Sequence, residues 1–471
     1  MPALTAFRSI LTFALAVLYL GNVFLSLPLL NLIIMLLLVM IIILSFPFVS
    51  GSSKIIAYVT FFAGIILLVA YKAPLSVWTH ALEENLYLVV MFAVVPLIGI
   101  PFKHGGYFDA LQRSFQLYVN TDTRFYLLVS FLSTFVGILV NLAVVPMVYQ
   151  ISKASARSKN IKLLSSALSR GFTTCTIWAP TTAAVALVLQ ATGTDWIHFF
   201  PYALLCGILC GIVGLGLNQW EQGNRLKSRN DLEQINIKES STLNQDIALS
   251  APAGQWQKLI ELAVWSIILI ASIAVISHLT GIKTITVVSM ASLVIPFLWM
   301  GTIKRLPDLR KAVKEEYYRV SLPKLKNEII LFMGAGLLAT SIAYSHIGNI
   351  VPGFFDLFIG ENIILLSYAI IFITVILSVI GVHPIISVAI FSSTIHAAAY
   401  HISPAYMAVI LAMSWAMGIT VSPSGAMVIG ISGLTGVSPA TIGPRWNLIY
   451  VVISTIVAIL ALTVIRLTGL L

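Results

Sequence analysis

The feature that most constrains this chain is a short motif that occurs twice, 243 residues apart. The first copy, residues 180–201, begins with Pro-Thr, contains Thr-Gly and ends with Pro. The second copy, residues 423–444, begins with Pro-Ser, contains Thr-Gly and ends with Pro. In both copies the first proline interrupts a stretch that is otherwise apolar enough to cross a bilayer. An interrupted hydrophobic segment that recurs in the two halves of a chain is the pattern that marks binding sites in many transporters.

The composition places the chain in a lipid bilayer. Apolar residues make up 59% of the sequence and charged residues only 9%, whereas soluble domains average about 25% charged residues. The apolar residues form runs of about 18–30, and about 20 residues cross the hydrocarbon core as a helix. The net charge of +10 comes from basic residues in loops, which is the positive-inside pattern and no sign of nucleic-acid binding. The sequence predicts an all-α polytopic protein of the cell (inner or plasma) membrane.

The apolar runs divide the chain into two similar halves. An extra N-terminal span in 1–29 precedes a first repeat over 30–219, a cytoplasmic linker over 220–258 and a second repeat over 259–471. Each repeat has scaffold spans, a re-entrant hairpin (123–150 and 362–400) and a broken helix (163–191 and 404–434). Eleven spans are expected in all, at 10–28, 30–48, 54–71, 86–101, 163–191, 196–219, 259–279, 283–301, 328–350, 404–434 and 441–468. A helix lying in the membrane interface is expected over 103–122, where aromatic and charged residues occur together, and an ordinary connecting loop is the alternative.

Small-residue breaks near the middle of two apolar stretches suggest that these stretches turn back within the membrane. The first break contains Ser133, Thr134 and Gly137, and the second contains Ser378, Gly381 and His383. Loop charge supports two such hairpins, because segments 151–162 and 302–327 are basic and a full span at either hairpin would move later basic loops to the outside. The N-terminus is then cytoplasmic and the C-terminus outside, with the first hairpin opening to the cytoplasm and the second to the outside.

The two broken helices carry the residues that a binding site needs. A proline cannot donate to the carbonyl four residues earlier, and hydroxyl residues crowd the turns around both prolines. Freed carbonyls suit a cation, and half-helix N-termini suit an anion. The competing interpretation is a pair of simple proline kinks whose hydroxyls only pack against other helices. The predicted site unites the hairpin residues with Thr176, Pro180, Thr181, Thr420, Ser422, Pro423 and Ser424 at the bilayer midplane.

Few charged residues lie near this site. Arg170 and Arg445 would suit an anion, although both stand near predicted cytoplasmic ends, where anchoring at the interface is the alternative. His383 is a candidate for proton coupling or a structural residue beside a turn. The sequence shows no metal-ligand spacing and no P-loop, so no cofactor is expected, and the three cysteines are expected to be packing residues.

The segment from Gly171 to Leu204 resembles the divalent anion:sodium symporter family of the ion transporter superfamily. The likeness rests on Thr176 to Thr182 at the broken helix, on the Asp195-Trp196 pair before the next span, and on the order of hairpin, broken helix and helix in each half. The resemblance implies an elevator-type secondary transporter, usually a homodimer. It also implies that Na⁺ or H⁺ is coupled to a small anionic substrate, a carboxylate or another oxyanion.

Three other classes remain open. A permease subunit of a binding-protein-dependent, tripartite-type carboxylate transporter would have the same organisation. A membrane enzyme such as a polysaccharide polymerase would need a large outside loop, and the longest one expected here has only about a dozen residues. A channel is disfavoured because no ring of charges accompanies the broken helices.

Overall fold

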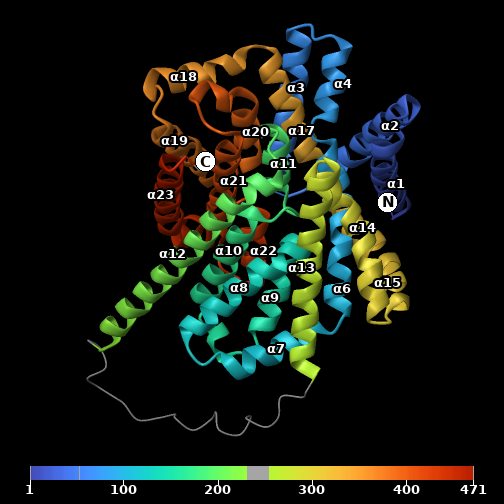
Figure 1. Cartoon of the computed structure of the whole chain (residues 1–471). Helices are drawn as coiled ribbons and strands as arrows, with labels where there is room; N and C mark the ends of the chain where they lie inside the picture. The colour runs from blue at the N-terminus through green and yellow to red at the C-terminus, as the bar shows by residue number, and fades with distance from the viewer. Residues whose placement is uncertain (1, 52, 231–253, 470–471) are drawn as a thin grey trace.

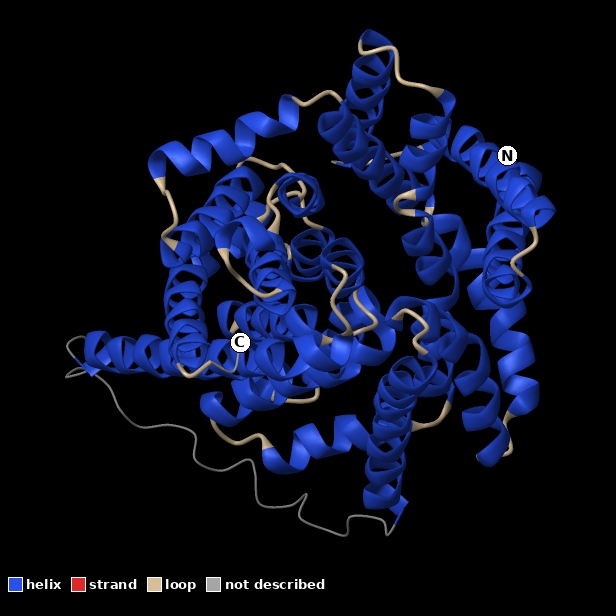
Figure 2. Ribbon diagram, turned by 45° about the horizontal axis from the view of Figure 1, so that its top comes forward, coloured by secondary structure: helices blue, strands red, loops and turns tan. Residues whose placement is uncertain are grey.

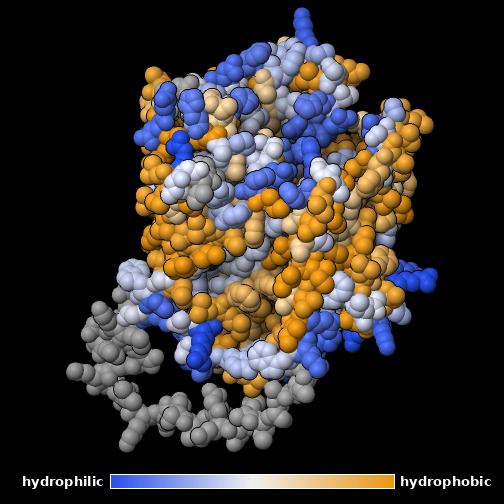
Figure 3. Space-filling model, in the orientation of Figure 1, coloured by the Kyte–Doolittle hydropathy of each residue, from blue (hydrophilic) through white to orange (hydrophobic). Residues whose placement is uncertain are grey.

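The computed structural model describes residues 2–51, 53–230 and 254–469, and over these residues the chain forms helices and no strand (Figure 1). Within the described residues, eleven helical segments are long and apolar enough to cross a membrane. The expected all-α polytopic membrane fold is therefore confirmed. On the face shown in Figure 3, apolar side chains form a belt across the middle of the molecule, with polar side chains at its upper and lower ends.

The number of spans agrees with the sequence prediction, but the segments that make up the two sets of spans are not all the same. The structural set includes Asp122–Ser152, which was predicted to be a hairpin, and leaves out the shorter apolar helix Lys54–Ala70. The segment Leu75–His104 is longer than the predicted span over 86–101. It consists of α4 (Leu75–Glu83), α5 (Leu86–Val94), the short turn η2 (Val95–Ile98) and α6 (Gly99–His104).

One group of helices links the beginnings of the two halves and lies on the right of Figure 1. It contains α1 (Pro2–Leu25), α2 (Pro28–Ser45), α3 (Ser53–Ala70) and α4–α6, with α13 (Gly254–Thr280), α14 (Thr284–Thr302), α15 (Leu306–Ala312), the π-helical stretch η5 (Val313–Ser321), α16 (Leu322–Lys324) and α17 (Lys326–Tyr344). Buried hydrogen bonds tie its two halves together. The Asn85 amide donates to the Phe332 carbonyl over 2.9 Å, and Ser341 Oγ donates to the Gly64 carbonyl over 3.0 Å.

The second group, on the left of Figure 1, holds the hairpins and the broken helices. From the first half come α8 (Asp122–Val140), α9 (Val144–Ser152), α10 (Ile161–Trp178), α11 (Ala183–Thr192) and α12 (Trp196–Asn230). From the second half come α19 (Ile363–Val379), α20 (Pro384–Thr394), α21 (Pro404–Val421), α22 (Ala426–Thr435) and α23 (Trp446–Leu467). Figure 2 shows the same helices from a direction tilted by 45°.

In both apolar stretches that contain the small-residue breaks, the chain reverses direction. After α9 the chain returns to the start of α8, where Arg157 Nη1 donates to Asp122 Oδ1 over 2.9 Å. After α19 the chain folds back along α20, whose Phe391 ring lies 5.9 Å from that of Phe355 in the helix before α19. The two hairpins open toward opposite ends of the molecule in Figure 1.

Each hairpin follows a helix at the edge of the belt. The first is α7 (Tyr107–Tyr118), where the sequence predicts an interface helix. The second is α18 (Ile350–Phe358), at the opposite end of the molecule (Figure 1), which the sequence analysis did not expect. The predicted linker over 220–258 falls largely outside the described residues, but α12 continues to Asn230, past the predicted end of its span.

Candidate functional site

Both predicted broken helices are broken at the same point of the repeated motif. The first break separates α10 from α11, and the second separates α21 from α22. The ends of these four helices are related by the same 243-residue spacing as the motif itself. Extended backbone flanks each break, at Ala179 and Thr182 in the first and at Ser422 and Gly425 in the second. The backbone leaves the helical conformation at each break, so both are interruptions of the helix and not simple proline kinks.

The first break is satisfied partly by the next helix. Thr182 N donates to the Ala179 carbonyl over 3.1 Å instead of to the Trp178 carbonyl, its helical partner. The Trp178 carbonyl accepts the indole N–H of Trp196 over 3.0 Å. Thr182 Oγ1 caps the new helix by accepting from Val185 N over 3.4 Å. The Asp195-Trp196 pair of the sequence resemblance thus supplies a donor to the broken helix, a role that the sequence alone did not show.

The second break is more open at the corresponding end. The residue before α22 is Gly425, which has no side chain that could cap the helix. The N–H groups of its first turn therefore lack the capping contact that Thr182 gives to α11. Ser422 Oγ and Ser424 Oγ lie 3.1 Å apart beside this end. An uncapped helix N-terminus with hydroxyls beside it is a suitable place for a small anion.

The hydroxyl residue after each proline ties the break to the turn of a hairpin. Thr181 Oγ1 donates to the Ile138 carbonyl over 2.6 Å, and Ser424 Oγ donates to the Gly381 carbonyl over 2.9 Å. Each bond spans 43 residues, and the two donors are again 243 residues apart. The motif therefore recurs in the sequence and in a pair of equivalent tertiary contacts.

The two anchors differ in burial. Thr181 is fully buried and Ile138 is 2% exposed, whereas Ser424 and Gly381 are both half-buried. The first contact is therefore sealed inside the protein, and the second is partly exposed at the protein surface.

The predicted tip of the first hairpin is wrong. Ser133, Thr134 and Gly137 lie inside α8, and the turn follows at Asn141–Ala143. Asn141 has φ 51°, a conformation that Asn tolerates better than most residues. Thr134 Oγ1 donates to the Gly171 carbonyl over 2.8 Å, and a Cβ at Gly137 would lie 3.1 Å from the Cys175 sulfur. These positions pack α8 closely against α10, and the buried hydroxyl of Ser133 has no partner.

The predicted tip of the second hairpin lies at the turn. Gly381 has φ +104°, a conformation that favours glycine, between the end of α19 and the start of α20. His383 caps α20, because its Nδ1 accepts from Ile385 N over 3.2 Å, and its ring meets Trp415 edge-on at 5.8 Å. Ser378 lies in the last turn of α19, where its Oγ donates to the Thr374 carbonyl over 2.7 Å. The capping contact gives His383 a structural role at the turn.

The two broken helices cross in the middle of the second helix group. Thr173 Oγ1 of α10 and Thr420 Oγ1 of α21 are hydrogen-bonded over 2.5 Å, and both side chains are fully buried. Thr176 lies one turn further along α10, and its Oγ1 donates to the Phe172 carbonyl over 2.9 Å. The crossing therefore brings the two halves of the predicted site into direct contact, with Thr173 as a member that the prediction missed.

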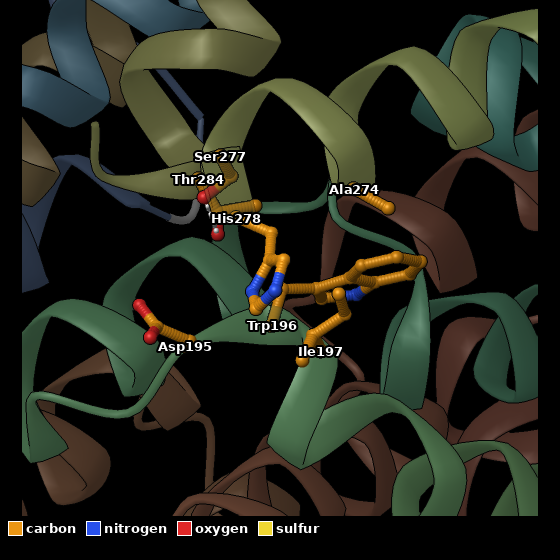
Figure 4. A pocket seen from close by; sticks show the side chains of 7 residues that line it. All are labelled: Asp195, Trp196, Ile197, Ala274, Ser277, His278 and Thr284. Atoms are coloured by element: carbon orange, nitrogen blue, oxygen red, sulfur yellow. Dashed lines mark hydrogen bonds between the residues drawn. The ribbon is translucent and has the colours of Figure 1, made fainter. Parts of the chain in front are cut away.

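A small pocket lies at the start of α12, where Trp196, the donor to the first break, forms part of its wall (Figure 4). Asp195, Trp196 and Ile197 of the α12 side face Ala274, Ser277 and His278 of α13 and Thr284 of α14. Ser277 Oγ and Thr284 Oγ1 are 3.1 Å apart in its wall. The pocket lies between the two groups of helices, where the start of α12 meets α13 and α14.

No metal-binding cluster of His, Cys, Asp or Glu is found among the described residues. The cysteines Cys175, Cys206 and Cys210 are buried and free, in line with the expected packing role.

No protein-family model matches this sequence. No curated protein is significantly similar to it. Among solved structures, the chain is similar to the YdaH transporter of Alcanivorax borkumensis, whose crystal structure is described as revealing an unusual topology. The sequence identity is 12% and the TM-score 0.54, over 86% of this chain and 98% of that one. This likeness shows the fold alone, and the resemblance to the divalent anion:sodium symporter family is not confirmed by it.

Proposed function

We propose that this protein is a secondary active transporter that moves a small anion, a carboxylate or another oxyanion, across the membrane by an elevator motion. One observation carries the proposal: two broken helices cross in the interior, and each is tied through its post-proline hydroxyl to the hairpin of its own half. This arrangement places irregular backbone inside the protein, where a bilayer protein tolerates it only around a cavity or a packed site. The fold shared with the YdaH transporter supports the proposal.

The anion is placed at the N-terminus of α22. The N-cap residue Gly425 gives the N–H groups of its first turn no side-chain cap, and Ser422, Ser424 and the Gly381 turn lie beside this end. A half-helix N-terminus carries a partial positive charge of about half an elementary charge. Such an end binds an anion without a charged side chain, which suits a site around which the described structure offers mainly hydroxyls and backbone.

The moving part is the group of helices α8–α12 and α19–α23. The other group, α1–α6 and α13–α17, is fastened across its halves by buried hydrogen bonds such as Asn85 to Phe332. The pocket of Figure 4 lies between the two groups. We infer that the second group slides against the first, and that α7 and α18 act as arms at the two membrane surfaces. Coupling to Na⁺ or H⁺ and a homodimeric state, both implied by the sequence resemblance, stay predictions.

The test begins with a ligand screen of the purified protein. Thermal unfolding is measured with carboxylates, sulfate and other oxyanions, with and without Na⁺, because a ligand that binds the folded state raises its apparent stability. Uptake of the best ligand into proteoliposomes is then measured with external Na⁺, with choline in its place, and with an imposed pH gradient. Slower uptake in choline identifies Na⁺ as the coupling ion, and dependence on the pH gradient alone identifies H⁺.

Variants locate the site. Ser422→Ala and Pro423→Leu are expected to reduce uptake about tenfold or more while the protein still reaches the membrane, because both disturb the second break. Ser393→Ala is the matched control, since its hydroxyl bonds only to the Ile390 carbonyl of its own helix. Wild-type uptake in both site variants would place the binding site elsewhere, and a ligand that binds without uptake would refute transport.

A further inference from the structure

Arg170 of α10 is buried in the protein and takes part in neither of the helix breaks. It is 3% exposed, which excludes the interface-anchoring role that its position in the sequence favoured. Its Nε donates to Asn447 Oδ1 over 3.0 Å and its Nη2 to the Trp446 carbonyl over 3.2 Å. The guanidinium lies 5.1 Å from the centre of the Tyr450 ring. A buried cation of this kind needs an explanation beyond anchoring.

A small polar cavity lies next to this arginine, between α10 and α12. Its volume is about 20 Å³, which is enough for one particle about the size of a water molecule. Charged and amide side chains line it: Lys162, Arg170, Asn218, Glu221 and Gln222. The cavity is on the side where α10 begins, more than two helical turns before the first break.

The charges around the cavity are positive on balance. Glu221 Oε2 pairs with Lys162 Nζ over 2.6 Å, and Glu221 Oε1 is 4.0 Å from Arg170 Nη2. Two cations therefore share one carboxylate. The first turn of α10 also begins here, capped by Asn160, so the positive end of that helix dipole adds to the same field.

Two buried hydrogen-bond donors in the cavity wall have no partner. Asn218 Nδ2 and Gln222 Nε2 are both inaccessible to solvent and make no hydrogen bond. Asn218 as a whole is only 7% exposed. The two residues are four apart in α12 and share the face that looks onto α10. Buried polar groups are nearly always paired in folded proteins. Because both orphan groups are N–H donors, the missing partner is a hydrogen-bond acceptor.

We propose that this cavity binds a small inorganic anion of halide size, held by the amides of Asn218 and Gln222 and by the Arg170 guanidinium. A cation would meet two N–H donors and an excess of positive charge, so it is disfavoured on both counts. Water is the neutral alternative, since it also accepts hydrogen bonds. The site is separate from the helix breaks, and the inference does not rest on the proposed transport.

The test compares chloride with gluconate, which is too large for the cavity, at constant Na⁺ concentration, pH and ionic strength. The purified full-length protein is expected to show a saturable rise in melting temperature of at least about 2 °C with chloride and with bromide. Asn218→Leu, which removes one donor at similar volume, is expected to abolish this rise. Bromide-soaked crystals measured at the bromine absorption edge are expected to show an anomalous peak in the cavity.

A matched control separates anion binding from general stability. Thr455→Val removes another buried polar group without a partner, on α23 and outside the cavity, and should keep the full chloride response. If Asn218→Leu does not fold, Gln222→Met provides the same test from the other donor. Equal melting temperatures in chloride and gluconate, with no bromide peak, would show that the cavity holds only water. A chloride response that survives loss of either donor would also overturn the proposal.

Discussion

The hydrogen bond from Thr181 to the first hairpin turn can be removed without changing the shape of the side chain. Thr181→Val replaces the hydroxyl with a methyl group of similar size. The Ile138 carbonyl, which accepts the hydroxyl over 2.6 Å in the wild type, then loses this partner near the end of α8. Because Thr181 is fully buried and Ile138 is 2% exposed, water cannot take the place of the hydroxyl while the hairpin stays docked.

The size of the effect follows from that burial. An unpaired buried acceptor costs about 1–3 kcal/mol, and the docked hairpin carries this cost while an opened one is hydrated. The population of the opened hairpin should therefore rise about 5- to 150-fold. Ser424→Ala at the equivalent contact should have a smaller effect, about 0.5–1.5 kcal/mol, because that contact is half-buried.

The natural Cys175 reports the opening. Its sulfur lies beneath Gly137 of the first hairpin and its side chain is fully buried, so a thiol reagent reaches it only when the hairpin moves away. With Cys206 and Cys210 replaced by alanine, the labelling rate of Cys175 measures the opened population when closing is fast. The assay needs no knowledge of the substrate.

The control is Thr192→Val, whose hydroxyl bonds only to the Val188 carbonyl of its own helix. We expect its Cys175 labelling rate to match that of the parent. A labelling rate in Thr181→Val that equals the control, in protein with an unchanged melting temperature, would refute the idea that the post-proline hydroxyl fastens the hairpin.

Three further outcomes are expected. Gly418→Ala should lower the melting temperature, because the new Cβ would lie 2.7 Å from the hydroxyl of Ser378 in the second hairpin. Gly433→Ala is the control and should not lower it, since no atom lies within 4 Å of its Cβ. Equal shifts in melting temperature would contradict this packing. Trp196→Phe should cost about 1–3 kcal/mol in unfolding measurements by leaving the Trp178 carbonyl without its indole donor; an unchanged stability would show that this bond adds nothing. Ala156→Cys, at an exposed position of the basic segment after α9, should react with impermeant reagents from the cytoplasmic side only, and labelling from outside would overturn the predicted topology.

The helix breaks could be predicted from the sequence because their cause is local. A proline removes a backbone donor wherever it stands in a helix, and Pro180 and Pro423 stand in apolar stretches with hydroxyls around them. The repeated spacing added evidence that one proline alone would not supply. The ends of all four half-helices then follow from the motif.

The turn of the first hairpin could not be located by the same reasoning. Its α8 passes through Thr134 and Gly137 without a break, because Gly137 is a place of close packing against Cys175 and needs no unusual backbone. The turn is fixed instead by a contact with Thr181, 43 residues later, which leaves no local signal. One sequence clue was available: the 243-residue spacing carries Gly381 back onto Ile138, next to the observed turn.

The missed α18 and Arg170 illustrate a second limit. The segment 350–358 is apolar apart from one aspartate, but its nine residues are too few for a span, and its proline and glycine disfavour a helix. The position of Arg170 near a predicted helix end favours anchoring at the interface. Its burial comes from α12 and α23 closing over it, through partners such as Asn447 that are 277 residues away in sequence.

The unequal burial of the two hairpin anchors gives the two turns different relations to water. At Gly381 a water molecule can replace the Ser424 hydroxyl as the donor, so hydration competes with docking. At Ile138 no water arrives until the hairpin has already moved. Opening of the first turn therefore takes up water that the docked state lacks, so osmotic stress should oppose it, and opening of the second turn, which is already partly exposed, should respond less. The repeat makes the two contacts equivalent by position, but their opening differs in how much water it takes up.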